Sequence, residues 1–304
     1  MSFILIILSS LFFIGIINRT KSILSGRKGP GIFQPLRDIR KLLKKGSVYS
    51  ETSSFIFQLG PSVYFSTVFA AALFIPFGDN RGLISFQFDF VLFAYLLALG
   101  KFFNIISALD TGSSFEGMGA SREALYSMLA EPAFFITIGS LGLLTGYTSF
   151  YQIFSSIHYS ESASPVITYA LGLLASTVFL FLGIIENSRV PVDDPKTHLE
   201  LTMIHEVMIL DNSGFDLGVV FYTGSLKFAL YGGLIANLFF LSSPYIVINI
   251  LIFFSLQVLY ALTVGIVESF MARLRLNQNP QFILMITSVS LLIFIGVMIV
   301  TGKI

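Results

Sequence analysis

Long apolar runs are the feature that most limits what this 304-residue chain can fold into. Eight of them approach or exceed the roughly 20 residues with which a helix crosses about 30 Å of hydrocarbon. We place these spans at residues 2–17, 55–77, 86–109, 124–150, 165–185, 217–241, 244–267 and 281–301. Strict alternation of polar and apolar residues, the mark of transmembrane strands, is absent. The sequence therefore predicts one all-α, polytopic membrane domain over residues 1–304, with short amphipathic helices in its loops.

Composition excludes several functions for the chain itself. It has no cysteine, so it cannot form disulfides, thiolate metal sites or iron–sulfur ligation with its own side chains. The residue four positions after His205 is Ile209, so the spacing of a zinc-binding histidine pair is missing. A net charge of +1 gives no support to nucleic-acid binding. We therefore predict no catalytic or metal-binding residues here, and any redox centre belongs in a partner subunit.

The basic residues predict the orientation of the spans. Fourteen of the eighteen lysines and arginines fall in the loops 18–54, 110–123, 186–216 and 268–280. Only Arg81 and Lys303 fall in segments on the other side of the membrane, and Lys101 and Lys227 lie inside spans. By the positive-inside rule these four loops are cytoplasmic and both termini lie outside, as in a multi-pass protein of the prokaryotic cytoplasmic membrane.

The first long loop contains a predicted amphipathic helix. After the turn-rich segment 26–31, residues 32–45 place apolar side chains at helical spacing with basic residues between them. Such a helix lies in the membrane interface and binds anionic lipid, or it forms a basic platform for a soluble subunit. The sequence leaves both interpretations open.

The segment 186–206 is densely charged, with five acids, two histidines, one arginine and one lysine. Charges this dense at a membrane boundary indicate ion or proton handling, or docking of a soluble partner. Asp194 can cap a helix whose first residue is Pro195, which predicts a helix over 195–210. At 100° per residue one face of that helix carries His198, Thr202, His205 and Glu206, and the opposite face Glu200 and Asp211.

Four ionisable side chains lie within predicted spans: Asp89, near the outer end of its span, and Lys101, Glu131 and Lys227. Pro132 follows Glu131 and leaves a backbone carbonyl free one turn earlier, where water can enter. This arrangement suits a proton relay, with the lysines as counter-charges. The alternative for each residue is a buried salt bridge or a side chain that reaches to the membrane surface.

Several of these blocks together resemble a known family. They are Gly29-Pro30, Gly117-Met-Gly-Ala-Ser-Arg-Glu123, Glu131-Pro132, Thr197-His-Leu-Glu-Leu-Thr-Met-Ile-His-Glu206 and Ser213-Gly214, with Glu186, Arg189, Pro191, Asp193 and Pro195. The chain resembles the membrane anchor subunit of energy-converting nickel–iron hydrogenases of the formate hydrogenlyase and hydrogenase-4 type. That subunit is homologous to subunit 1 of complex I.

The resemblance implies a non-catalytic subunit of an ion-translocating redox complex. Its expected partners are a hydrogenase-like large subunit, iron–sulfur small subunits and antiporter-like membrane subunits, and the nickel–iron centre and iron–sulfur clusters belong to those partners. The expected proton or sodium path comprises Glu131, Glu186, Glu200, Glu206 and Asp211, with Lys101 and Lys227. The expected docking residues for the redox arm are Arg27, Arg37, Arg40, Arg189 and Asp193.

Two departures from the family pattern keep alternatives open. Asp211-Asn212 stands where the family usually has a glutamate and an aromatic residue, so this acid is one methylene shorter. The first loop is also brief for a quinone site. The alternatives are a quinone-site subunit of a complex I-type oxidoreductase, a purely structural scaffold, and a secondary transporter, although the two halves of the chain show no internal repeat.

Overall fold

The structure, a computed structural model, describes residues 1–159, 165–194 and 202–302. Within these ranges eight helices are long and apolar enough to cross a membrane, as predicted. They are α1 (Ser2–Leu24), α3 (Phe55–Ala71, extended by the 3-10 turn η1, Ala72–Phe74), α4 (Asp89–Asp110), α5 (Ser114–Thr145), α7 (Pro165–Glu186), α9 (Gly214–Leu238), α10 (Ile246–Phe270) and α11 (Asn279–Val300). Three shorter helices lie between them: α2 (Gln34–Leu42), α6 (Phe150–Tyr159) and α8 (His205–Met208). The prediction of an all-α polytopic membrane protein is confirmed.

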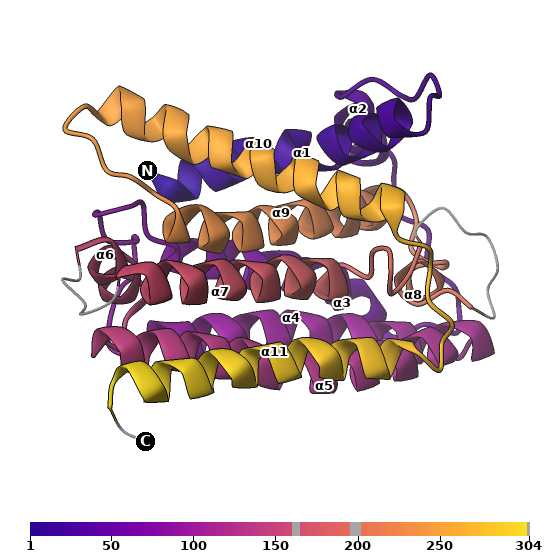
Figure 1. Ribbon diagram of the computed structural model, residues 1–304. Coiled ribbons are helices and arrows are strands. Elements are labelled where there is room, and N and C mark those ends of the chain that lie inside the picture. Colours follow the sequence, from indigo (N-terminus) through magenta and orange to yellow (C-terminus); the bar gives the residue numbers. More distant parts are fainter. Residues whose placement is uncertain (160–164, 195–201, 303–304) are drawn as a thin grey trace.

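The spans run side by side with α9 in the interior of the bundle (Figure 1). Helices α1 and α10 pack on one side of α9, and α3 and α7 pack on the other. Helices α4, α5 and α11 form the outer layer beyond α3 and α7. Both termini lie at one end of the bundle, whereas α2 and α8 lie at the opposite end, which we call the α8 end.

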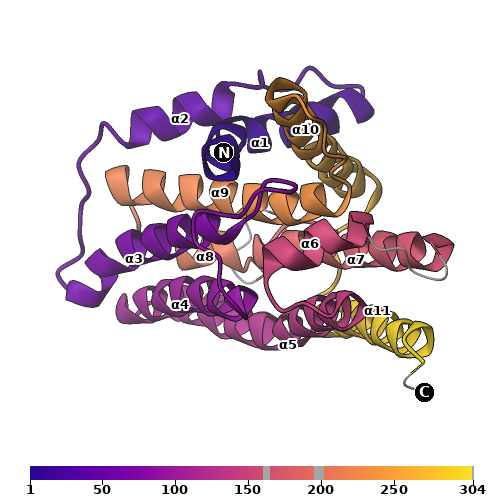
Figure 2. The same ribbon diagram turned by 90° about the vertical axis from the view of Figure 1, so that its left-hand side faces the viewer.

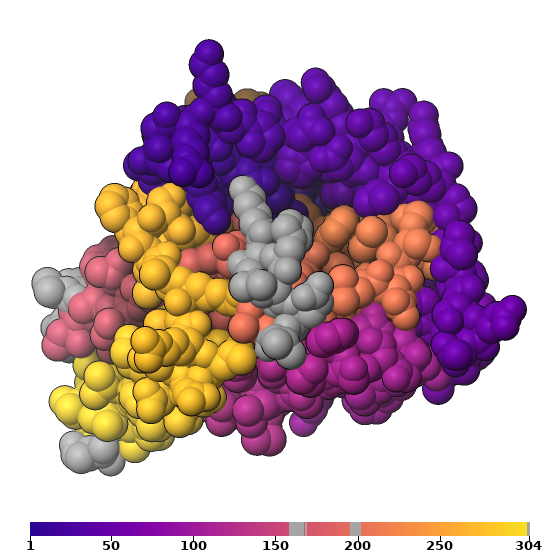
Figure 3. All heavy atoms as spheres, turned by 90° about the vertical axis from the view of Figure 1, so that its right-hand side faces the viewer, coloured from indigo at the N-terminus to yellow at the C-terminus, as the bar shows by residue number. Residues whose placement is uncertain are grey.

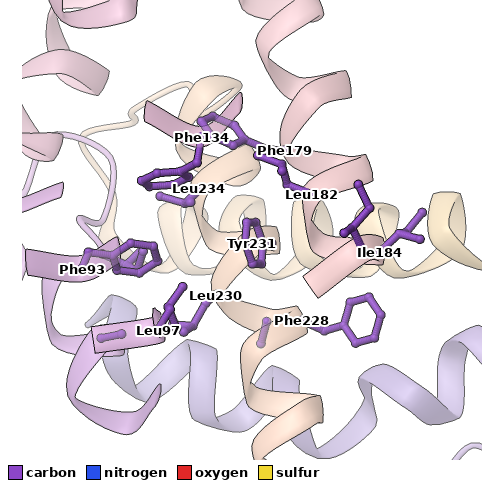
Figure 4. Close-up of a cluster of buried hydrophobic side chains, with 14 of the residues drawn as sticks. Phe93, Leu97, Phe134, Phe179, Leu182, Ile184, Phe228, Leu230, Tyr231 and Leu234 are labelled. Carbon is purple, nitrogen blue, oxygen red and sulfur yellow. The ribbon is translucent and has the colours of Figure 1, made fainter. Parts of the chain in front are cut away.

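The core forms where α9 meets its neighbours (Figure 4). Leu230, Tyr231 and Leu234 of α9 are buried and lie among side chains of α4, α5 and α7. Those side chains are Phe93, Leu97, Phe134, Phe179 and Leu182. Without a hydrophobic driving force between helices in lipid, dense packing of this kind holds a membrane bundle together.

Helix α5 starts at Ser114, not at the predicted Ala124, so most of the predicted loop 110–123 is helical. The segment was missed because its glycines and charged residues lower the hydropathy. It is held instead by packing: a Cβ atom on Gly119 would lie 2.8 Å from the Ile204 carbonyl oxygen and 2.3 Å from the Val207 side chain. Only glycine lets α8 approach α5 this closely.

The predicted span 124–150 also ends too late. Helix α5 ends at Thr145, and the next residue, Gly146, adopts a left-handed conformation with a φ of 77°. A separate helix, α6, begins at Phe150, whose backbone N–H donates to Asp89 Oδ1 at 2.8 Å. Asp89 therefore stabilises the start of α6.

The prediction of a continuous helix over 195–210 is wrong in the part that the structure describes. Only His205–Met208 is helical there, and residues 202–204 are not. The backbone groups of this segment bond to side chains of other elements: Asp193 Oδ2 accepts from the Ile204 N–H at 2.8 Å, and the Met203 carbonyl accepts from Arg122 at 2.9 Å. Residues 195–201, which include His198 and Glu200, lie outside the described residues.

Candidate functional site

Four charged side chains from four spans meet inside the bundle. Lys101 Nζ of α4 lies 2.8 Å from Glu186 Oε2 at the end of α7 and 3.2 Å from Glu123 Oε1 of α5. Lys227 Nζ of α9 lies 2.8 Å from the same Glu186 oxygen and donates to the Glu186 carbonyl at 2.7 Å. The Ser188 hydroxyl donates to Glu123 Oε2 at 2.9 Å. We call Lys101, Glu123, Glu186 and Lys227 the charged cluster; its two lysines and two glutamates balance in charge.

Two cavities meet at Glu186. The first, of about 60 Å³, lies between α4, α5 and α7, and both Lys101 and Glu131 line it. The second, of about 70 Å³, is lined by His205 and Glu206 and reaches Glu186 from the α8 end. Each has room for a few water molecules, and polar groups line both. Water in both cavities would place Glu206, Glu186 and Glu131 along one hydrated route.

Glu131 occupies a different environment from the cluster. It lies near the middle of α5, its side chain is exposed on the side of the bundle, and it lines the mouth of the first cavity. An exposed carboxylate in the middle of a span is costly in lipid. A neighbouring membrane subunit or a water-filled space therefore has to cover this position.

The loop after α7 is fixed to the bundle by buried ion pairs. Arg189 donates to both carboxylate oxygens of Glu268 on α10, at 2.6 and 3.0 Å, and its guanidinium lies 5.8 Å from the centre of the Phe228 ring. Lys21 Nζ of α1 lies 2.9 Å from the second Glu268 oxygen. Because bidentate arginine–carboxylate pairs are strong and directional, this triad holds the loop in one geometry.

A second ion pair fixes the loop to the segment before α11. Arg273 Nη2 lies 2.7 Å from Asp193 Oδ1, and the same arginine donates to the Thr202 carbonyl. The Leu274 N–H donates to the Pro191 carbonyl at 2.9 Å. Figure 3, viewed on the α8 end, shows the orange loop residues between the magenta of α5, the yellow of the C-terminal segment and the indigo of the N-terminal segment.

Two acids of this loop region hold protons more tightly than usual. Burial raises the pKa of Glu206 to about 7; the Asp193 charge adds to the increase, and Arg189 opposes it. Burial also raises the pKa of Asp193, against the lowering effect of Arg273 and of backbone N–H donors. Burial lowers the pKa of His205, so this imidazole favours its neutral form. Glu206 can therefore gain or lose a proton near neutral pH.

Glu206 gives a prediction for stability against pH. The pKa of Glu206 is raised from 4.5 to about 7 on folding. Its contribution to the free energy of unfolding is therefore fully present below pH 4.5 and is lost as the pH rises through 7. The loss is at most about 3 kcal/mol, because one pKa unit corresponds to about 1.4 kcal/mol. Glu206→Gln removes this dependence and makes the purified complex more stable than the parent at pH 8. Thermal unfolding of the parent and of Glu206→Gln between pH 5 and 9 measures this pH dependence of stability.

The control for this experiment is Asp211→Asn, which removes an exposed carboxylate from the same region. We expect its stability profile to follow that of the parent. Parallel profiles for Glu206→Gln and the parent would show that Glu206 does not bind a proton in this range.

The structure places the remaining predicted residues as follows. Asp211 is exposed, and its N–H donates to Glu116 Oε1 at 3.0 Å; it lines neither cavity that contains Glu186. Arg189 and Asp193 are buried and bind inside the chain, so they shape the loop without forming its outer surface. Three docking candidates are exposed: Arg27, in the connection before α2, and Arg37 and Arg40, on α2.

Sequence reasoning missed Glu123 and Glu268 as parts of the site. Glu123 was assigned to a loop because the predicted span began one residue later, and the early start of α5 brings it inside the bundle. Glu268 falls in the predicted loop 268–280, directly after the span 244–267. Its signal was the pair of basic residues, Lys21 and Arg189, at the same predicted membrane boundary.

The Ser213-Gly214 block has a structural role. The Ser213 hydroxyl accepts from the Val48 N–H at 2.8 Å and donates to the Val48 carbonyl at 3.1 Å. Gly214 has a φ of 51°, and a Cβ atom there would lie 2.1 Å from the Gly46 carbonyl oxygen. This block joins the first loop to the start of α9.

The fold and the site together define a class of protein: a polytopic membrane subunit that keeps a network of ionisable side chains inside its helix bundle. The sequence profile of the NADH dehydrogenase family matches residues 1–300. The chain belongs to this family, which contains proteins like subunit 1 of complex I.

Individual relatives agree with this assignment. Hydrogenase-4 component C of Escherichia coli (strain K12) is 34% identical over 236 residues, covering 78% of this chain and 72% of the relative. Formate hydrogenlyase subunit 4 of the same organism is 30% identical over 275 residues, covering 88% and 87%. A chain in the structure of the membrane-bound sulfane sulfur reductase, an archaeal respiratory membrane complex, superposes with a TM-score of 0.81 at 18% identity, over 97% of this chain and 96% of that one. This chain is therefore a complex I-like membrane subunit.

Proposed function

We propose that this protein is the membrane anchor subunit of a complex I-like, energy-converting hydrogenase of the formate hydrogenlyase type. It docks a soluble redox arm and contributes acids to a proton or sodium path coupled to the redox reaction. The observation that carries the proposal is the meeting of two cavities at Glu186, one containing Glu206 and the other reaching Glu131. The relatedness to hydrogenase-4 component C and formate hydrogenlyase subunit 4 supports the type of complex.

The proposed path starts at the α8 end and leaves through the side of the bundle. Glu206 exchanges a proton near neutral pH because its pKa is about 7. The proton then passes through the charged cluster at Glu186, which Lys101 and Lys227 keep ionised between transfers, so Glu186 holds the proton only in transit. Glu131 passes it to the neighbouring membrane subunit that covers its exposed carboxylate. A charge change in the docked arm that moves the loop near Arg189 alters the proton affinity of Glu206 and starts the transfer.

The arm is proposed to dock on the α8 end, at Arg27 and at the loop that Arg189 and Asp193 hold. The nickel–iron centre and the iron–sulfur clusters belong to the large and small subunits of that arm, and antiporter-like subunits lie beside the spans. The α8 end then faces the cytoplasm, and both termini lie outside the cytoplasmic membrane.

Partner identity tests the type of complex. We expect a mild-detergent pull-down of the tagged chain to recover a large subunit with two Cys-x-x-Cys pairs, and nickel in the sample. A large subunit without these pairs would indicate a quinone or another acceptor. Recovery of no large subunit would contradict the anchor function and favour a transporter.

Glu131→Gln tests the path. The variant keeps the side-chain volume but cannot carry a proton, so we expect redox turnover to continue while the ions moved per turnover fall by about tenfold or more. The measurement compares hydrogen evolution with ion uptake by the complex in liposomes. Glu51→Gln, which removes an exposed loop carboxylate, is the control. Unchanged coupling in Glu131→Gln would remove this residue from the path.

A further inference from the structure

Three basic side chains of α2, together with Lys44 two residues after its end, lie on one side of the helix. Arg37, Arg40, Lys41 and Lys44 follow the i, i+3, i+4, i+7 spacing that places residues on one side, and Ile39 on the opposite side is buried. The four side chains surround a surface hollow of about 230 Å³. We call these four residues the α2 basic face.

The apolar side of α2 fixes the direction of this face. Gly218 of α9 lies against α2, since a Cβ atom there would be 3.0 Å from Leu42 and 3.2 Å from Leu43. Helix α2 lies beside α1 and α9 at the α8 end (Figure 1), and it crosses α1, because Figure 2 shows α2 lengthwise and the start of α1 nearly end-on. The α2 basic face therefore points away from the bundle at the level of a membrane boundary.

The four cations lack an internal counter-charge. In the described ranges, no carboxylate oxygen lies within 4.0 Å of their nitrogen atoms. The one acid of α2, Asp38, instead accepts from Gln34 Nε2 at 2.9 Å. Four like charges around one hollow repel one another, so an external anion stabilises this arrangement.

The neighbouring surface indicates the source of that anion. Exposed apolar side chains border α2 at the end of α1, in the connecting loop and on α2's own edge: Ile23, Leu24, Ile32, Phe33 and Leu43. Basic residues beside exposed apolar ones are typical of a helix in the lipid interface, where phosphates lie above acyl chains. A soluble acidic protein would satisfy the cations but leave these apolar side chains in water.

We propose that the α2 basic face binds the phosphate group of an anionic phospholipid in the leaflet at the α8 end. The lipid then covers the apolar border with its acyl chains and holds α2 against α9. This site is separate from the charged cluster and does not depend on the proton path.

The test compares two double variants of the purified complex. Arg40→Gln with Lys41→Gln removes two charges from the α2 basic face, and Arg19→Gln with Lys28→Gln removes two exposed charges outside it, from α1 and from the following loop. Phosphatidylglycerol binding is measured by native mass spectrometry and by the thermal shift on its addition, with phosphatidylcholine and inorganic phosphate as comparison probes. We expect the first pair to weaken phosphatidylglycerol binding by about thirtyfold and the second to leave it nearly unchanged.

Three results would overturn the proposal. Equal losses in both double variants would mean that general surface charge attracts the lipid. Inorganic phosphate that stabilises the parent as well as the lipid does would identify a free-anion site. Unchanged lipid binding, with loss of the soluble subunits from the first variant in a pull-down, would mean that the α2 basic face docks an acidic protein. Exchanging the two residues, Arg40→Lys with Lys41→Arg, preserves the charge and is expected to preserve binding.

Discussion

Replacing Glu186 with glutamine is expected to abolish ion translocation and to destabilise the protein by about 3–5 kcal/mol, the usual cost of removing one partner from a buried ion pair. Glu186 is the carboxylate that Lys101 and Lys227 share, with both Nζ atoms 2.8 Å from the same oxygen. The amide cannot balance either ammonium group. Among the described residues, Lys101 retains Glu123 at 3.2 Å, whereas Lys227 retains the backbone carbonyl of residue 186 and no carboxylate within 4.0 Å. Thermal unfolding of the purified complex and ion uptake by liposomes measure the two effects.

A second variant separates stability from transport. Glu186→Gln combined with Lys227→Met removes one charge of each sign, and the Lys101–Glu123 pair remains. We expect this double variant to recover most of the stability, because the buried charges balance again, but not the ion transport. Recovery of transport as well would show that Glu186 has only a structural role. A stable, active single variant would contradict the central position of Glu186.

The fold was largely predictable because length and hydropathy determine where helices cross a membrane. The ionisable residues Lys101, Glu186 and Lys227 were also predictable as a group, since charges are rare in apolar runs and stand out there. What the sequence could not show is which of them meet. The ion pairs join α4, α5, α7 and α9, and sequence separation carries no information about contacts between spans.

The errors have a common physical origin in long-range contacts of the loops. Within the described part of the predicted helix 195–210, residues 202–204 are not helical, because the Ile204 N–H donates to Asp193, eleven residues earlier in the chain. The first turns of α5 are too polar for a hydropathy window and are helical because Gly119 packs against α8. Both depend on tertiary packing, which overrides local propensity.

Arg189→Met is expected to destabilise the protein by about 3 kcal/mol or more and to release the soluble arm. Glu268 is buried and receives two hydrogen bonds from Arg189, so the substitution leaves it with Lys21 as its remaining ion-pair partner. The loop also loses its contact with Phe228. Since Arg189 faces inward, any loss of the arm must follow from loss of loop geometry. Thermal unfolding and the recovery of soluble subunits in a pull-down measure the effects.

Lys21→Met is the matched control, because it removes the other cation of the same triad. The Lys21 side chain is 20% exposed and makes one contact with Glu268, whereas Arg189 is 9% exposed and makes two. Partly exposed ion pairs contribute about 1 kcal/mol or less to stability. We therefore expect Lys21→Met to destabilise the protein far less than Arg189→Met does and to keep the arm bound. Arg189→Lys keeps the charge without the bidentate geometry and should fall between the two. Equal effects of Lys21→Met and Arg189→Met would show that Glu268 needs only total positive charge, and that the geometry of Arg189 does not hold the loop.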